Sequence, residues 1–189
     1  MIERWLVRRV LGGDARAADQ LVAQHYPRVL RFLRHLTGSR TDAEDLAQQT
    51  FLSARQSLPR FRFECSLSTW LHRIAYHEFS HWLRGRHETA MPLPERTVEI
   101  AGRSEDAVIL AAAIADLPEE LRTAFVLREV QQLSVREAAA VLGVPEGTIK
   151  SRNHTARERL REALAGTWII SDAEATNGND RWEERHEPV

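Results

Sequence analysis

His77 and His81 flank Glu78 in the pattern H-E-x-x-H, an arrangement that could bind a metal ion and perform hydrolysis. On a helix this spacing places both imidazoles on one face, where they could hold zinc while Glu78 served as the general base of a protease. Some zinc proteases have a third histidine where this chain has His87, but they need glycine at the position of Arg84. A zinc metalloprotease acting through HEFSH is therefore a remote alternative. We expect no metal ion, no cofactor and no catalytic residues.

Residues 133–165 predict two helices joined by a tight turn. Ser134 and Glu137 form a capping box for the first helix, which ends at Gly143, and the second helix begins near Glu146. This is the pattern of a helix-turn-helix, whose second helix enters the major groove of DNA. The polar side chains opposite its apolar stripe are Lys150, Ser151, His154 and Thr155. Residues 134–165 carry six cationic and four anionic side chains, so their charge alone decides little. The helix-turn-helix pattern is what favours DNA binding over an ordinary basic surface helix.

A loop rich in aromatic and basic residues follows the helix breaker Leu58-Pro59. Arginine and phenylalanine alternate over residues 60–63, which suits single-stranded nucleic acid because unstacked bases lie on aromatic rings while cations follow phosphates. The helix that follows, to about Arg86, carries on its outer side Arg73, Tyr76, His77, Ser80 and Arg84. A core helix with arginines for solubility explains these residues equally well.

The composition limits the kind of protein. The chain has 189 residues, a net charge of −1 and a single cysteine. Because the net charge is near zero, any nucleic-acid site must be a local basic patch. A single cysteine cannot form a disulfide within the chain, which fits a reducing compartment. No apolar run reaches the ~18 residues of a transmembrane helix, and the charged start does not match a signal peptide. We expect a soluble, cytoplasmic protein without membrane insertion.

Apolar residues at helical spacing predict an all-α chain. A first helix covers residues 2–12. Asp14 caps a second helix that ends near Tyr26, and Pro27 opens a third helix that ends at Gly38.

The next helix, residues 42–57, begins with a capping box formed by Thr41 and Glu44. Its outer face is acidic and rich in amides, which is usually just a solvated face but is also the type of surface that docks against a basic partner. The residues on this face are Asp42, Asp45, Gln48 and Gln49. Residues 87–103 contain two prolines and no clean hydrophobic period, which indicates a linker between domains. The residues after Gly166 form an acidic tail that we expect to be mobile.

Three stretches in this order closely resemble the extracytoplasmic-function (ECF) sigma factors, the small two-domain initiation factors of the bacterial sigma-70 family. They are DAEDLAQQTF, SLSTWLHRIA and LPEELRTAFVLREVQQLSVREAAAVLGVPEGTIKSR, and the resemblance covers about residues 5–165. It implies two small helical domains, an N-terminal bundle and a C-terminal helix-turn-helix domain, joined by a flexible linker. The implied boundaries are 1–87 for sigma region 2, 88–103 for the linker, 104–165 for region 4 and 166–189 for the tail.

The resemblance also implies partners and site residues. In this family region 2 binds the β′ clamp helices of core RNA polymerase and opens the promoter −10 element, while region 4 binds the β flap and reads the −35 element. The family's usual regulation implies an anti-sigma factor as well. By position, the polymerase contacts are Asp42, Asp45, Gln48 and Gln49. The −10 contacts are Arg62, Phe63, Ser66, Ser68, Arg73, Tyr76, His77, Ser80 and Arg84. The −35 contacts are Lys150, Ser151, Arg152, His154, Thr155 and Arg157, of which Arg152 and Arg157 are expected to bind phosphate.

Some positions depart from the family pattern and leave details open. His77 and His81 replace residues that are often Asn and Asp, and Glu78 replaces an apolar or small residue, which puts the exact −10 readout in doubt. Asn153 replaces an aliphatic residue, which puts the local packing in doubt. The main alternative function is a helix-turn-helix regulator that binds DNA without acting as a polymerase subunit, and such a protein would shift duplex DNA on its own.

Overall fold

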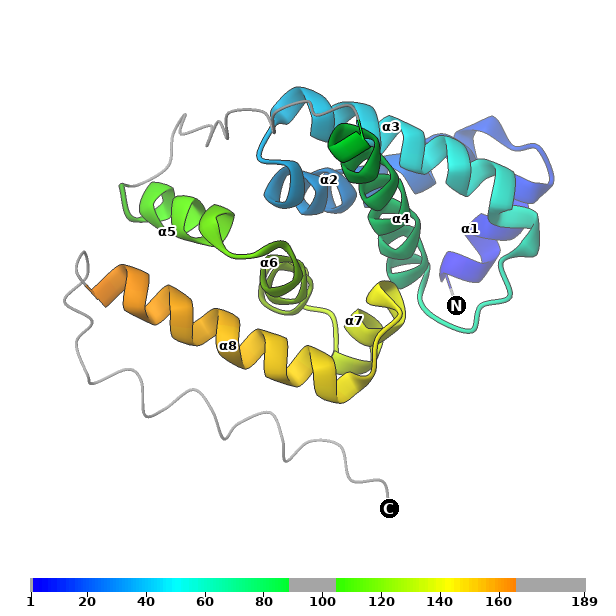
Figure 1. Ribbon diagram of the computed structural model, residues 1–189. Coiled ribbons are helices and arrows are strands. Elements are labelled where there is room, and N and C mark those ends of the chain that lie inside the picture. The colour runs from blue at the N-terminus through cyan, green and yellow to red at the C-terminus, as the bar shows by residue number, and fades with distance from the viewer. Residues whose placement is uncertain (1, 89–104, 166–189) are drawn as a thin grey trace, which may run out of the picture.

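The computed structural model describes residues 2–88 and 105–165, and this part of the chain is helical with no strand. The predicted all-α class is therefore confirmed. The described residues form two units, residues 2–88 and residues 105–165 (Figure 1). The predicted linker falls almost wholly, and the predicted tail wholly, outside the described residues. None of the described helices is both long and apolar enough to cross a membrane.

The first unit is a bundle built around one long helix. Its elements are α1 (Ile2–Leu11), α2 (Ala15–Thr37), α3 (Arg40–Ser57), a 3-10 turn (Leu58–Arg60) and α4 (Leu67–Glu88). Helix α2 packs against α1, α3 and α4. Phe32 and Leu33 of α2 and Leu71 and Phe79 of α4 are completely buried between them. Burial of each such side chain stabilises the fold by about 1.5–3 kcal/mol, so this apolar interior holds the bundle together.

Helix α2 continues through Pro27, so the predicted boundary between two helices at this residue is wrong. A proline inside a helix removes one hydrogen bond and costs ~3 kcal/mol. However, Leu21, Val29 and Phe32 lie on a single buried stripe that runs past the proline, and Pro27 itself is exposed. Because the burial of this stripe outweighs the cost of the proline, tertiary packing keeps the helix continuous.

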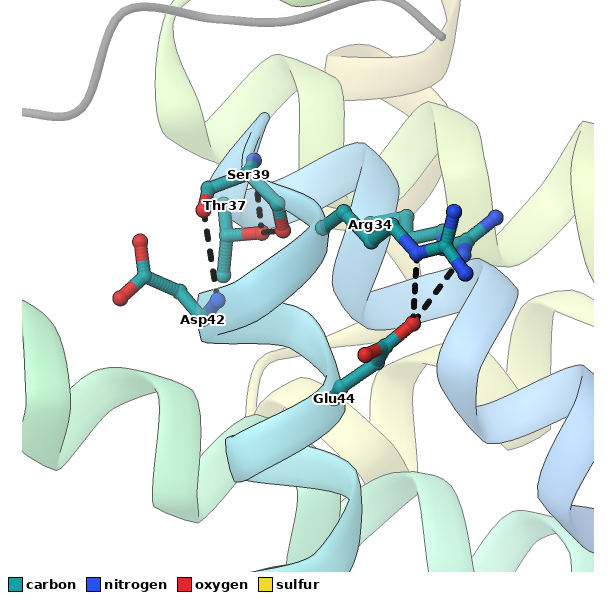
Figure 2. Close-up of polar contacts among 6 residues, drawn as sticks. Arg34, Thr37, Ser39, Asp42 and Glu44 are labelled. Atoms are coloured by element: carbon teal, nitrogen blue, oxygen red, sulfur yellow. Dashed lines mark hydrogen bonds and ion pairs between the residues drawn. The ribbon is translucent and has the colours of Figure 1, made fainter. Parts of the chain in front are cut away.

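Helix α3 begins two residues earlier than predicted, with Ser39 in place of Thr41 as its N-cap (Figure 2). The Ser39 hydroxyl accepts a hydrogen bond from the Asp42 amide at 3.3 Å. The predicted capping box is wrong, because Glu44 instead binds the guanidinium of Arg40 at 2.8 Å and that of Arg34 at 3.5 Å. The Arg34–Glu44 pair connects α3 to the end of α2, and the start of α3 is left to a serine cap.

The second unit contains the predicted helix-turn-helix. Its elements are α5 (Glu105–Asp116), α6 (Glu119–Phe125), a π-helical turn (Val126–Val130), α7 (Val135–Leu142) and α8 (Glu146–Ala165). Both halves of the Ser134–Glu137 capping box are present, and Gly143 ends α7 with a φ of 68°. Helix α8 packs against α6 and α7 through Ile149 and Ala156, which are completely buried. The local signals of residues 133–165 were therefore sufficient to predict this part of the fold.

The two units pack against each other, which the sequence did not predict. Helix α7 lies on the amino-terminal part of α4, and α2 contacts α5, α6 and the π-helical turn (Figure 1). His72 of α4 and Gln131, which follows the π-helical turn, are both almost fully buried between the units. Residues of both units therefore have to be considered together when the candidate site is built.

Candidate nucleic-acid interface

The outer face of α8 is arranged as predicted. Ile149, Ala156 and Leu160 are buried, while the predicted −35 contacts at the start of the helix point to solvent. The exposed members are Lys150, Ser151, His154, Thr155 and Arg157, and Arg152 is partly buried. Lys150 is also the only lysine in the whole sequence. This face offers a cation, two hydroxyls and an imidazole near the amino end of a helix, where helix-turn-helix proteins contact base edges.

Asn153 lies within the buried stripe of α8 and is only 9% exposed. Its side-chain amide donates a hydrogen bond to Glu129 at 2.9 Å, and Glu129 also pairs with Arg157 at 2.8 Å. A polar residue is tolerated at this position because the π-helical turn brings a carboxylate to it. The sequence alone could not reveal this partner, which lies 24 residues earlier in the chain.

The two arginines expected to bind phosphate are both engaged within the second unit. Arg152 pairs with Glu120 at 2.5 Å, and Arg157 pairs with Glu129. Ion pairs at a surface contribute only about 0–1 kcal/mol. Both guanidinium groups can therefore exchange a carboxylate for a phosphate at small cost.

The loop of residues 61–66 is held by aromatic contacts. The Phe61 ring lies 4.6 Å from the Phe63 ring and 4.8 Å from the Trp70 ring, measured between centroids. Phe63 has a φ of 59°, a left-handed backbone conformation that is uncommon for a bulky residue and is found mostly where function requires it. The Arg4 guanidinium lies over the Phe63 ring at 5.2 Å. Arg4 was not predicted, because nothing in its local sequence points to a residue 59 positions away.

The predicted −10 contacts extend from this loop along α4. Arg62, Ser66, Arg73, His77 and Arg84 are exposed, and Phe63, Ser68, Tyr76 and Ser80 are half-buried. The structure therefore brings the set together as one line of side chains on one helix and the loop before it. Burial raises the pKa of the Tyr76 phenol, and the nearby Glu119 of the second unit raises it further.

The H-E-x-x-H residues do not act as one group. The His77 and His81 rings lie side by side, with centroids 4.5 Å apart. Glu78 instead accepts a hydrogen bond from the Ser53 hydroxyl of α3 at 2.7 Å. Within residues 2–88 and 105–165, no three His, Cys, Asp or Glu side chains gather as a metal site. The carboxylate serves to join α4 to α3.

The acidic and amide-rich face of α3 is open to solvent. Asp45, Gln48 and Gln49 are exposed, and Asp42 is half-buried beside Arg86 at 3.6 Å. Gln48 also borders an apolar hollow of about 660 Å³ between α1, α2, α3 and the start of α4. Its lining includes Val22, Phe51 and Leu52. The sequence revealed the polar half of this surface but not the apolar hollow beside it.

Hydrogen bonds join the two units near the amino end of α4. Thr69 donates to the Glu137 carboxylate at 2.9 Å, and Ser66 lies 3.5 Å from the same oxygen. His72 Nε2 lies 3.3 Å from Oε1 of the Gln131 side chain. Arg28 donates to the Gln131 backbone carbonyl at 3.1 Å. Residues next to the predicted −10 loop are therefore in direct contact with the helix-turn-helix unit.

Two family models match the chain in the same order as the two units. The model described as "Sigma-70 region 2" matches residues 21–89, and that described as "Sigma-70, region 4" matches residues 107–160. The first covers most of α2 and all of α3 and α4, and the second covers most of α5 and continues into α8.

Curated proteins of similar sequence carry related names. The chain is 36% identical over 161 residues to the "ECF RNA polymerase sigma factor SigM" of Mycobacterium tuberculosis, a match that covers 82% of this chain and 80% of that protein. It is 33% identical over 183 residues to the "RNA polymerase sigma-H factor" of Pseudomonas aeruginosa, covering 86% of this chain and 93% of the relative.

Two solved structures with a similar fold each contain a second protein bound to the matching chain. The sigma factor RpoE bound to the anti-sigma factor NepR, from Bartonella quintana, matches with a TM-score of 0.71 and 29% identity over 79% of this chain and 98% of its own. CnrH in complex with the cytosolic domain of CnrY matches with a TM-score of 0.68 and 28% identity, covering 87% of this chain and 98% of CnrH.

Proposed function

The chain belongs to the extracytoplasmic-function sigma factors of the sigma-70 family, and we propose that it binds core RNA polymerase and directs it to promoters with its own −35 and −10 elements. The observation that carries this proposal is the presence of both family regions, in order, on one chain that aligns with curated ECF sigma factors over most of its length. A helix-turn-helix regulator that works without polymerase has no need of region 2.

Region 4 supplies the anchoring contacts. Lys150, Ser151, His154 and Thr155 present donors and acceptors to base edges, and Arg152 and Arg157 bind the flanking phosphates. A good contact to a base edge discriminates against the wrong base by about 1–3 kcal/mol. The phosphate contacts set the register of α8 on the duplex but carry little sequence information.

Region 2 captures the opened strand. Extruding a base from a duplex costs a few kcal/mol, and stacking on an aromatic ring returns about 1–3 kcal/mol for each base. Phe63 is a half-buried member of the aromatic cluster with Phe61 and Trp70, and the neighbouring Arg62 is exposed and can bind the phosphate. Further contacts follow along α4 through Ser66, Ser68, Arg73, Tyr76, His77, Ser80 and Arg84.

The exposed face of α3 supplies the polymerase contact. Asp42, Asp45, Gln48 and Gln49 offer acceptors and negative charge to the β′ clamp helices, and the apolar hollow beside Gln48 supplies surface for burial. An apolar centre with a polar rim is the usual anatomy of a protein interface. Region 4 binds the β flap in the same complex.

We propose that the chain works by binding free energy, without a catalytic residue of its own, and that it acts in the cytoplasm, where polymerase and chromosome are. We further propose an anti-sigma factor as a regulatory partner. This is supported by the two similar structures, in which RpoE is bound to NepR and CnrH to the cytosolic domain of CnrY. Recovery of such a partner with the tagged chain from uninduced cells tests this part.

Run-off transcription with purified core polymerase tests the main proposal. Core enzyme with the chain should give a specific transcript from the promoter of the chain's own operon, and core enzyme alone should not. A chain that gives no specific transcript, but shifts the same duplex DNA tightly without polymerase, would instead be a regulator. Sequencing of the promoters bound by the holoenzyme would then define the two elements.

A further inference from the structure

The exposed face of α1 carries a tryptophan between two arginines. Apolar side chains bury the opposite face of this helix against the bundle, but Trp5 is 54% exposed, and Arg4 and Arg8 are exposed beside it. Glu3, the acidic residue of the helix, is half-buried and does not share this face. A single exposed apolar ring is common on a protein surface, so the contacts around Trp5 decide what it signifies.

The Trp5 ring is held in place by a chain of polar contacts. The Arg9 guanidinium lies 4.5 Å from the centroid of this ring. Arg9 in turn donates a hydrogen bond through Nε to the Asp14 carboxylate at 2.7 Å, and Asp14 also accepts one from the Ala17 amide at 3.1 Å, where it caps α2. A side chain that is positioned before its ligand arrives loses less conformational freedom on binding. Trp5 is therefore a preorganised ring with an exposed surface.

Arg4 connects this face to the loop of residues 61–66. Its guanidinium lies 5.2 Å from the centroid of the Phe63 ring, the residue of the loop with the left-handed φ of 59°. Helix α1 also packs against the 3-10 turn that opens the loop, and Figure 1 shows α1 beside this segment. Trp5 and Phe63 therefore belong to one continuous surface, on which each ring is held by an arginine of α1.

The composition of this surface selects its partner. Aromatic rings between cations suit single-stranded nucleic acid, because unpaired bases stack on the rings while the cations follow the phosphates. The face of α3 proposed for polymerase has the opposite sign, since Asp42 and Asp45 lie on it. A basic partner that fits α3 would be repelled by Arg4 and Arg8. Charge and continuity with the loop both favour an opened DNA strand over a second protein.

The connectivity of the chain gives the direction of that strand. The carboxyl end of α4 leads through residues 89–104 to the unit proposed to read the upstream −35 element. The loop and α1 lie at the other end of α4, its amino end. A strand that runs from the −35 side along α4 and past the loop therefore meets α1 with the bases downstream of the −10 element.

We propose that α1 extends the −10 site to the single-stranded DNA just downstream of it, where Trp5 stacks on an unpaired base of the non-template strand and Arg8 binds a phosphate. The inference rests on the proposed function, because it assumes that the loop of residues 61–66 holds the opened strand. It goes beyond that function by adding two residues of a helix to which no DNA contact was assigned. Stacking on a ring is nearly independent of the base, so this contact adds affinity and not sequence specificity.

Extension of a single-stranded probe is the first measurement. The short probe is the non-template strand of the chain's own promoter, labelled at its 5′ end and ending with the −10 element. Long probes carry an added run of thymidines at the 3′ end or, as the control, at the 5′ end. Fluorescence anisotropy with the holoenzyme should show that the 3′ run tightens binding by roughly tenfold, the effect of one stacked base, and that the 5′ run does not. No gain from the 3′ run would overturn the proposal.

Variants show whether α1 provides this gain. Trp5→Ala should lose most of the gain from the 3′ run, and Trp5→Phe should keep most of it because it retains a ring. Leu110→Ala is the matched control, since it removes an exposed apolar side chain from α5 in the other unit and should leave the gain unchanged. The same gain in Trp5→Ala as in the wild-type chain would contradict the proposal, and so would an equal loss on the short and long probes.

The salt dependence of binding tests Arg8. For single strands the logarithm of the binding constant falls against the logarithm of the salt concentration with a slope of about −0.7 for each phosphate contacted. Arg8→Gln should therefore reduce the slope for the 3′-extended probe by about 0.7 and leave that for the short probe unchanged. Arg159→Gln makes the same charge change on an exposed residue of α8 and should alter neither slope. Equal slopes for Arg8→Gln and the wild-type chain would rule out the phosphate contact.

The remaining outcomes separate this inference from the proposed function. If Trp5→Ala weakens the affinity of the chain for core polymerase but not the gain from the 3′ run, α1 contacts a protein and the proposal is wrong. If the holoenzyme binds the short probe and Phe63→Ala weakens that binding, but the 3′ run adds nothing, the proposed function stands and only the extension along α1 fails. If no holoenzyme forms, the proposed function fails and the extension fails with it.

Discussion

Asn153 and Glu129 form a hydrogen bond of 2.9 Å at the edge of the apolar stripe that holds α8 against the rest of its unit. The bond gives a partner to the side-chain NH2 group of a residue that is only 9% exposed. A buried donor left without a partner costs about 1–3 kcal/mol. The position of α8 therefore depends on a polar pair as well as on Ile149 and Ala156.

Glu129→Ala should lower the free energy of unfolding by about 1–3 kcal/mol, because it leaves the Asn153 amide buried and unpaired. Arg157→Ala removes only the exposed partner of Glu129 and should cost about 0–1 kcal/mol. Urea unfolding followed by circular dichroism measures both. If the two substitutions destabilise the chain equally, the buried amide does not need Glu129.

Lys150→Ala should weaken promoter recognition at the −35 element by roughly 10- to 100-fold, the effect of losing a contact of about 1–3 kcal/mol to a base edge. Arg161→Ala, near the carboxyl end of the same helix, should have little effect because base contacts come from the start of the recognition helix. Holoenzyme binding to promoter duplexes with intact and scrambled −35 elements measures this. A similar loss of promoter binding by Lys150→Ala and Arg161→Ala would mean that only the positive charge of α8, and not a contact to a base edge, contributes to binding.

Phe63→Ala should reduce the yield of open complex by roughly 10- to 100-fold, since a stacked base contributes about 1–3 kcal/mol. Phe63→Trp should restore most of the yield because it keeps an aromatic face. Permanganate reactivity of unpaired thymines reports the opening, and binding to the −35 duplex serves as the control. Equal opening by Ala and Trp would rule out stacking on this ring.

Asp45→Lys should weaken binding to core polymerase by about tenfold, mainly through a slower association rate, as expected for an exposed charge at an interface. Asp106→Lys makes the same charge change on an exposed residue of α5 and should leave the rate nearly unchanged. Surface plasmon resonance at two salt concentrations separates the two cases. A loss of the same size for Asp106→Lys would show a general effect of charge.

The chain should lose stability as the pH falls below about 6.5, the ordinary pKa of histidine. Burial lowers the pKa of His72, to which Arg28 also contributes, and burial likewise lowers the pKa of His25. Below pH 6.5 the unfolded chain therefore takes up protons that the folded chain does not, and stability falls until the folded pKa is passed. The slope should be at most about 1.4 kcal/mol per pH unit for each histidine.

Chemical unfolding of the wild-type chain and of His72→Gln between pH 7.5 and pH 5 tests this expectation. His72→Gln should reduce the slope of the free energy of unfolding against pH by up to the equivalent of one proton. If the curve of the variant runs parallel to that of the wild-type chain, His72 is protonated equally in the folded and unfolded states.

Local signals were sufficient for most of the fold and for the exposed faces. The Ser134–Glu137 box, Gly143 and the stripe of α8 each depend on neighbours within a few residues, so the helix-turn-helix could be predicted. Contacts between distant segments could not be predicted. The continuity of α2 through Pro27 depends on burial against other helices. The tolerance of Asn153 depends on Glu129, and the position of Arg4 over Phe63 depends on how α1 packs.

The same limit applies to the interface between the units. Glu137 was identified correctly as a helix cap, but a capping box uses only one of its oxygens, and no local pattern indicates what the other oxygen binds. Similarly, His77 and His81 share a face as their spacing requires, but the partner of Glu78 is set by the packing of α3 on α4.

The solitary lysine at position 150 has a practical consequence for handling the protein. Amine-directed reagents have one side-chain target in the whole sequence, and it lies exposed on the proposed −35 face of α8. Coupling through this amine would attach the molecule to a sensor or bead with its −35 face hidden and the −10 loop still free. An acyl group on the same nitrogen would erase one positive charge at that face while the arginines elsewhere stayed unmodified.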